Sequence, residues 1–204
     1  MKIALDPILE GRDVTIVAGG SSLKGFDFSK LRGAVIAVND AFRYCDADIM
    51  VACDKEWWKH NDTSEFKGIK ISGVRTYAED HIGAYVSPDH STKDLDWHVE
   101  KCNLSGYTAL AVAFHLGAAH VWLLGYDGGF DGNESNFYKN RNPNVKSDGY
   151  EQQNDFYEAF RDYPIINVGL DSKIKAFVKV PLNSYFYGYR IIGTRKVQRN
   201  LAEA

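Results

Sequence analysis

Short apolar runs separated by polar turns recur along the chain and predict buried β-strands. Each run has five to seven residues and is rich in Val, Ile, Leu or Ala, a composition typical of strands covered on both faces. The runs occupy residues 14–18, 34–39, 48–53, 68–73, 121–127 and 165–169. We expect the run at 165–169 to be the last strand of the core.

Helical patterns lie between these runs. The clearest covers residues 104–120, "LSGYTALAVAFHLGAAH", where frequent alanines keep the helix slim enough to pack closely on a sheet. Ser105 is the expected N-cap, and Gly117 is expected to weaken or end the helix. Shorter helical segments are predicted at 26–33, 55–61 and 151–160.

The alternation of strands and helices predicts the fold class, an α/β, Rossmann-like protein with a mostly parallel sheet and helices on both faces. A length of 204 residues suits a single domain, which we take to span residues 1–204. Residues 77–103 have weak periodicity and many polar side chains. Long irregular stretches in compact domains are typically functional or mobile, so we expect a lid-like excursion there.

The charge and the cysteine content limit the cellular compartments and the binding partners that we expect. The net charge of −3 gives no basic footprint, so bulk nucleic-acid binding is not expected. Cys45, Cys53 and Cys102 have neither a CxxC nor a metal-ligand spacing, which indicates reduced thiols. No apolar run approaches the ~20 residues of a membrane span, and the first residues do not resemble a signal peptide. We expect a soluble protein in the cytoplasm of a bacterium or a phage-infected host.

Small or polar residues follow the predicted strands at the point where each strand ends. The carboxyl ends of parallel strands meet at one edge of a sheet, and open α/β sheets bind their ligands there. We therefore predict a ligand site formed by residues 19–22, 39–40, 54 and 125–127.

The most distinctive of these strand ends is the stretch "VTIVAGGSSLKG". Gly19 and Gly20 would let the backbone approach a ligand, while Ser21 and Ser22 add hydroxyl donors to a run of backbone N–H groups. Such a turn can hold a phosphate. It matches neither the G-x-G-x-x-G pattern nor the P-loop pattern, and a plain tight turn is the alternative.

The remaining strand ends have two interpretations each. Asn39 and Asp40 could contact a base or ribose, or could cap the following helix. Asp54 has the same two interpretations. Ser105 and Gly106 open the clearest helix, whose N-terminus could bind an anion, and simple capping is the alternative.

Candidate metal ligands and bases are few. The Asp46-x-Asp48 spacing occurs in metal-binding nucleotide-sugar enzymes, but it precedes a strand and so lies at the wrong end of the sheet. We predict no metal site. The histidines of the excursion could act as a general base or be exposed loop residues; they are His81, His90 and His98.

Three stretches together resemble the bacterial sialyltransferases of glycosyltransferase family 42: "VTIVAGGSSLKGFDFSKL", "VIAVND" and "LSGYTALAVAFHLGAAHVWLLGYD". They are equally similar to a broader Rossmann-like group that includes archaeal 6-hydroxymethylpterin diphosphokinases and phage-encoded relatives. The resemblance implies nucleotide contacts from Gly19, Gly20 and Ser22, with Asn39 near the base or ribose. It also implies that Ser105, Gly106 and Asp127 lie against the nucleotide, and that Asp54 is a polar strand-end residue.

The chain departs from the sialyltransferase pattern at several positions. Gly19 stands where the family has Asn, and Ser21 where it has Pro. The family's catalytic histidine lies after the strand that ends in G-x-D, whereas this chain has no histidine after His120. The departures affect the proton-transfer chemistry more than the nucleotide site.

These features predict a transferase that binds a nucleotide or nucleotide-sugar donor, with Asp54 and Asp127 as catalytic candidates. One alternative is an ATP-dependent diphosphokinase of the pterin type, which would need Mg²⁺ held by carboxylates such as these. Another is a non-catalytic module that binds a nucleotide without turnover. The expected partner is a small nucleotide ligand, and the sequence leaves open whether the chain forms a homo-oligomer.

Overall fold

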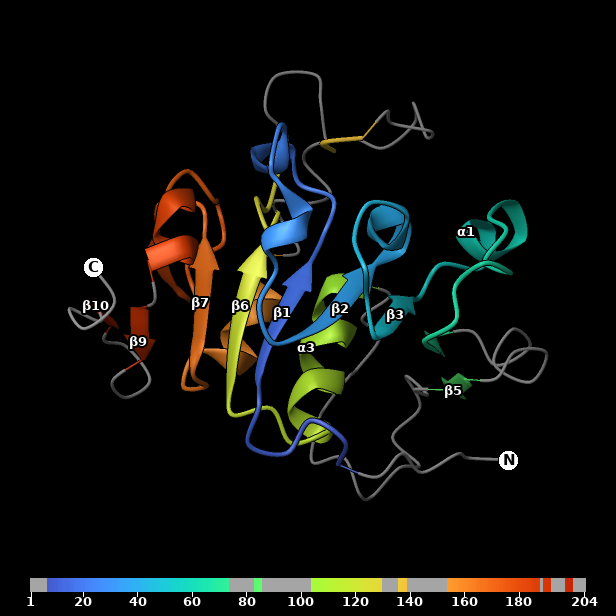
Figure 1. Ribbon diagram of the computed structural model, residues 1–204, viewed down its shortest axis with the longest axis horizontal. Coiled ribbons are helices and arrows are strands. Elements are labelled where there is room, and N and C mark those ends of the chain that lie inside the picture. The colour runs from blue at the N-terminus through green and yellow to red at the C-terminus, as the bar shows by residue number, and fades with distance from the viewer. Residues whose placement is uncertain are drawn as a thin grey trace.

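The fold is built on one eight-stranded sheet in which every neighbouring pair of strands is parallel. Figure 1 shows β7, β6, β1, β2 and β3 side by side. The computed structural model describes residues 7–73, 83–85, 104–129, 136–138, 154–187, 189–191 and 197–199. The strand order is β5-β4-β3-β2-β1-β6-β7-β8. The predicted α/β fold class is confirmed. The strands are β1 (Asp13–Val17), β2 (Ala34–Val38), β3 (Ile49–Ala52), β4 (Ile69–Ser72), β5 (Gly83–Tyr85), β6 (His120–Leu124), β7 (Ile165–Val168) and β8 (Val178–Val180).

Each predicted helical segment contains a helix. The α-helices of the described residues are α1 (Lys55–His60) and α3 (Ser105–His115). The 3-10 helices are η1 (Ser21–Leu23), η2 (Phe28–Lys30), η3 (Asn39–Arg43), η4 (Asn154–Phe160) and η5 (Leu182–Tyr187). Gly117, with φ 94°, follows the end of α3 as predicted, because this left-handed conformation carries no Cβ penalty in glycine.

The sheet is covered on both faces because successive strand residues point to opposite sides. Val14 and Ile16 of β1 belong to the core on the α3 face. Val17 belongs to the core on the other face, which also contains Leu23 of η1 and Tyr185 of η5. Figure 1 shows α3 running alongside β1 and β2, and its small residues allow this close approach.

Three expectations need correction. Residues 165–169 do not contain the last core strand, because β8 pairs with β7 beyond it. The excursion at 77–103 contributes the edge strand β5, and its other residues lie outside the described part. Ser105 is not the N-cap of α3: Leu104 occupies that position and makes no side-chain cap bond. The polar group of Ser105 is used elsewhere, as described below.

The C-terminal part of the described chain forms a separate two-stranded antiparallel sheet, β9 (Tyr189–Ile191) with β10 (Val197–Arg199). No helix within the described ranges is long and apolar enough to cross a membrane.

The strand order reverses between β1 and β6. From β1 the chain proceeds through β2, β3, β4 and β5 in one direction, and it then returns to place β6 on the other side of β1. In open α/β sheets the crevice at such a reversal, at the carboxyl ends of the strands, is where ligands bind. A ligand site is therefore expected at the carboxyl ends of β1 and β6.

Candidate functional site

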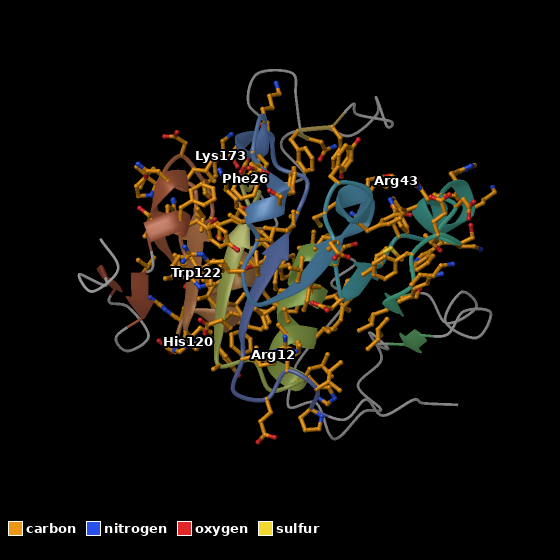
Figure 2. The ribbon with its side chains drawn as sticks, viewed as in Figure 1. Arg12, Phe26, Arg43, His120, Trp122 and Lys173 are labelled. Atoms are coloured by element: carbon orange, nitrogen blue, oxygen red, sulfur yellow. The ribbon has the colours of Figure 1, made fainter. Side chains whose placement is uncertain are left out.

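The predicted site residues lie along the carboxyl edge of the sheet, on strands that are neighbours. Continuing the β1–β2 register by two residues places Asn39 beside Gly19. Continuing the β1–β6 register places Asp127 beside Gly20. Figure 2 shows Lys173, Phe26 and Arg43 at this end of the molecule, with His120 and Arg12 at the opposite end.

The β6 tip, residues 125–127, is joined to the Gly-Ser turn, residues 19–22, by a set of hydrogen bonds. Asp127 accepts from the Ser22 backbone N–H at 2.9 Å, from the Ser22 hydroxyl at 2.6 Å and from the Ser21 hydroxyl at 3.3 Å. The Gly20 N–H donates to the Gly125 carbonyl at 2.9 Å. The donors that were predicted to hold a phosphate thus hold a carboxylate of the protein itself.

Packing against backbone requires the glycine at Gly20, whereas the ends of two side chains crowd Gly19. A Cβ on Gly20 would lie 2.5 Å from the Gly125 carbonyl oxygen and 2.5 Å from the Asp127 carboxyl carbon. A Cβ on Gly19 would lie 2.6 Å from Asn136 Oδ1 and 2.7 Å from the Tyr138 hydroxyl. The Phe137 N–H also donates to the Gly19 carbonyl at 2.8 Å, so residues 136–138 lie directly over the end of β1.

At the β2 tip, residues 39–40, Asn39 is unlike the other strand ends. Its φ is 52°, a left-handed conformation that non-glycine residues adopt rarely and that asparagine tolerates best. Its side-chain oxygen Oδ1 is buried and has no hydrogen-bond partner in the part of the chain that the structure describes. A buried acceptor without a partner is costly, and such strain is concentrated at functional sites.

Asp40, the next residue, is buried and fully engaged. It pairs with Arg43 Nε at 3.2 Å and accepts from the indole N–H of Trp57 at 3.1 Å. These contacts hold η3 against α1. Neither residue of the β2 tip caps a helix, because the N-cap of η3 is Val38 and no side-chain cap bond is formed.

Asp54 is the N-cap of α1. Its Oδ1 accepts from the Glu56 N–H at 2.7 Å and from the Trp57 N–H at 3.3 Å. The capping interpretation of this residue is therefore correct, and the carboxylate is exposed. Its second oxygen, Oδ2, makes no hydrogen bond to the described residues, so one acceptor atom is available at the edge.

Ser105 and Gly106 attach the start of α3 to the sheet. The Ser105 hydroxyl accepts from the Cys53 N–H at 3.0 Å, at the end of β3. Tyr126 donates its hydroxyl to the Gly106 carbonyl at 3.0 Å. Burial, and then the neighbouring Tyr157, raises the pKa of Tyr126, so this hydroxyl stays protonated as a donor. A Cβ on Gly106 would lie 2.8 Å from the Tyr157 hydroxyl, which explains the glycine.

A hollow of about 530 Å³ opens at the reversal point, a size typical of ligand pockets. One wall is polar, with Ser21, Ser22 and Asp127. The rest of the lining was not predicted from the sequence. It comes from the end of β7 and from the loops after β6, β7 and β8: Gly129, Val168, Gly169, Leu170, Asp171, Ser172, Lys173, Pro181 and Leu182. The Lys173 N–H donates to the Asp127 carbonyl at 2.7 Å, which holds this loop against the β6 tip.

The remaining candidates lie away from the edge or outside the described residues. His81, His90 and His98 lie outside the described residues. His120 pairs with Asp13 at the amino end of the sheet, 2.8 Å from Nδ1 to Oδ1. Asp48 accepts from the Val35 N–H at 2.8 Å, at that same end. Within the described ranges, no three His, Cys, Asp or Glu residues are grouped to hold a metal ion.

Comparisons with known proteins support the fold. The sequence matches no family model and no curated protein. Among solved structures, the chain is similar to the sialyltransferase CstII from Campylobacter jejuni in complex with CMP-3FNeuAc, with 17% identity, a TM-score of 0.54 and coverage of 94% of this chain and 92% of that one. The CstII structure with cytidine-5'-monophosphate has 18% identity and a TM-score of 0.56, with coverage of 95% of this chain and 91% of that one. The CST-II structure with trisaccharide acceptor and CMP has 16% identity and a TM-score of 0.50, with coverage of 93% of this chain and 91% of that one.

At these identities the likeness establishes a shared fold. It confirms the resemblance to sialyltransferases at the level of architecture, over nearly the full length of both chains. The resemblance to diphosphokinases and phage proteins stays a prediction. The chain thus has the fold of a sialyltransferase whose structures contain CMP, a CMP-sugar analogue or an acceptor trisaccharide.

Proposed function

We propose that this protein is a glycosyltransferase-like transferase that binds a nucleotide-sugar donor at the carboxyl edge of its sheet. The nucleotide would lie along the ends of β1 and β2, over Asn39, Asp40 and the Gly-Ser turn. The N-terminus of α3, at Ser105 and Gly106, would direct its positive dipole end to the same edge. The shared fold with a sialyltransferase supports this class of donor.

One observation carries the proposal: the buried, unpartnered Oδ1 of Asn39. An amide oxygen accepts hydrogen bonds, and a nucleotide offers suitable donors in its ribose hydroxyls and the exocyclic amine of its base. A ligand donor would provide the bond that the protein does not, which removes the cost of the buried acceptor. The strained, left-handed backbone of Asn39 is then a cost that ligand binding would explain.

The state of the Gly-Ser turn limits how a phosphate could bind. Ser21 and Ser22 already donate to Asp127, so a phosphate at this turn would compete with that carboxylate. The Gly20 N–H is likewise taken by the Gly125 carbonyl. We therefore place the base or ribose at Asn39, and the phosphate at the start of α3. The 530 Å³ hollow beside Asp127 gives room for the rest of the donor.

The reaction would transfer the sugar from its phosphate to an acceptor hydroxyl. The bond between the anomeric carbon and the phosphate oxygen breaks, a bond to the acceptor oxygen forms, and the nucleotide leaves with its negative charge. The acceptor's proton needs a base. Of the two candidates, Asp54 is favoured because its Oδ2 is available, whereas both oxygens of Asp127 accept bonds from the turn. Positioning would supply much of the catalysis.

A binding module without turnover is the second candidate. The observation that favours it is that Asp54 and Asp127 both hydrogen-bond to backbone N–H groups, as structural carboxylates do.

Calorimetry with CMP, UDP, GDP and ATP, and with a CMP-sugar and a UDP-sugar, tests the proposal. We expect one nucleotide to bind, its sugar conjugate to be consumed, and the Asp54→Asn variant to bind without turnover. Binding without consumption by the wild type would favour the module. ATP consumption that EDTA abolishes would favour the diphosphokinase, and no binding to any nucleotide would refute the proposed function.

A further inference from the structure

Four aromatic rings form a cluster beside the proposed nucleotide site. The aromatic cluster consists of Phe28, Tyr44, Phe137 and Tyr138, which come from three separate segments of the chain. Tyr44 follows η3 and so lies five residues after Asn39. Phe137 and Tyr138 belong to the segment that lies over Gly19. Arg43, the residue before Tyr44, is labelled at the edge of the sheet in Figure 2.

The cluster is anchored in the core and ends at the surface. Phe28 packs edge-on against the buried Phe26 at a centroid distance of 5.1 Å, and against Phe137 at 5.2 Å. Phe137 in turn packs edge-on against Tyr44 at 5.1 Å and Tyr138 at 4.9 Å. The orientation of the outermost ring is therefore set by a continuous series of contacts.

Tyr44 is the exposed end of this series. It is 46% exposed, although its ring is held by Phe137 on an edge and by Tyr138 in a parallel arrangement, with centroids 5.6 Å apart and an interplanar angle of 10°. An oriented ring that stays half exposed next to a ligand site has the properties of a stacking surface.

The spacing of the two tyrosines decides what can stack there. A planar base held between two rings needs centroids about 7 Å apart, twice the optimal carbon–carbon separation. At 5.6 Å the pair admits nothing between its rings, so only the outer surface of Tyr44 is usable. Polar atoms lie nearby, since Asn136 Oδ1 and the Tyr138 hydroxyl both approach Gly19.

The exposed face of Tyr44 is an oriented apolar surface, which matches the apolar C–H face of a pyranose ring. We propose that Tyr44 is the stacking surface for a pyranose ring of the substrate, which belongs either to the donor sugar or to the acceptor. This inference rests on the proposed function, since it names the part of a glycosyl substrate that this side of the site holds.

Saturation-transfer NMR with methyl glycosides and with the nucleotide-sugar tests this assignment. Irradiation of the protein's aromatic protons should transfer saturation to the C–H face of a pyranose in the wild type and in Tyr44→Phe. The Tyr44→Ala variant should lose this transfer, with sugar affinity weakened about tenfold. The matched control is Tyr163→Ala, which removes a tyrosine of similar exposure, 38%, two residues before the amino end of β7.

Two arms identify the source of the pyranose. If Tyr44→Ala reduces the affinity for the nucleotide-sugar to that for the bare nucleotide, the ring is the donor sugar. If it leaves donor affinity unchanged and weakens glycoside binding about tenfold, the ring is the acceptor. Equal saturation transfer in wild type and Tyr44→Ala overturns the proposal, as does wild-type binding of nucleotide-sugar and glycosides without transfer to a pyranose ring.

The outcomes also separate this proposal from the proposed function. Glycoside binding that depends on Tyr44, without binding of any nucleotide, would support the stacking surface and refute nucleotide binding. Nucleotide binding with no role for Tyr44 would support nucleotide binding and refute the stacking surface.

Discussion

The tips of β2 and β6 flank the same end of β1, and they differ in whether their polar side chains have hydrogen-bond partners. At the β6 tip, Asp127 accepts three hydrogen bonds from the Gly-Ser turn and is satisfied within the protein. At the β2 tip, Asn39 adopts a left-handed backbone and buries an oxygen that has no described partner. Both residues are polar strand ends, so their chemical type alone does not distinguish them.

The difference separates two roles along one edge. The bonds at the β6 tip hold the end of β1 in place, and their loss should lower stability. The strain and the missing bond at the β2 tip lower stability already, and they make sense where a ligand supplies the partner.

The Gly20→Ala variant should disrupt the contact between β1 and the β6 tip. The new methyl group would lie 2.5 Å from the Gly125 carbonyl and from the Asp127 carboxyl, and overpacking against backbone costs about 3 kcal/mol. Urea denaturation measures the free energy of unfolding.

Gly25→Ala is the matched control, because a Cβ there meets nothing within 4 Å and only the positive φ of 74° is strained. We expect a loss of about 1 kcal/mol for this variant. Equal losses for the two variants would contradict the packing role of Gly20.

The Asp127→Ala variant should lower the free energy of unfolding by about 2 kcal/mol, because the Ser22 N–H and two hydroxyls lose their acceptor. The control is Asp171→Ala, which removes an exposed carboxylate beside the same hollow. Its effect should stay within about 0.5 kcal/mol. If both variants are equally stable, the bonds at the β6 tip contribute nothing and the two tips do not differ in role.

The Ser105→Ala variant should cost about 1.5 kcal/mol, because the buried Cys53 N–H is left without its acceptor. Thermal unfolding monitored by circular dichroism checks this, with the exposed Ser64→Ala as control. A loss no larger than that of the control would show that this bond does not hold α3 to the sheet.

Much of this fold could be predicted from the sequence, because strands buried on both faces are nearly continuous apolar runs. Ile36 and Val51 lie in such runs, and both belong to predicted strands. β8 was missed because it has only three residues and contains Lys179, whose ammonium donates to the Ser172 carbonyl. A three-residue segment that contains a charged residue does not have the apolar pattern that predicts a core strand.

The residues at the carboxyl edge of the sheet could be predicted, but the hydrogen bonding of each of them could not. The order of strands places Asn39, Asp54 and Asp127 at one edge because parallel strands share their direction. Which of them is satisfied depends on contacts between distant parts of the chain, such as Ser22 with Asp127. The lining of the hollow after β7 and β8 depends on the packing of loops, for which the sequence carries little periodic signal.

The Asn39→Gly variant isolates the role of the Asn39 amide, because glycine accepts the left-handed backbone while removing the amide. The removal of the strained residue and of its buried acceptor predicts a free energy of unfolding no lower than that of wild type. It also predicts that the nucleotide identified by calorimetry binds at least about tenfold more weakly, a loss of about 1.4 kcal/mol. Both quantities can be measured on the same sample, by urea denaturation and titration calorimetry. Unchanged nucleotide affinity in a folded Asn39→Gly protein would contradict the claim that the amide of Asn39 binds the nucleotide.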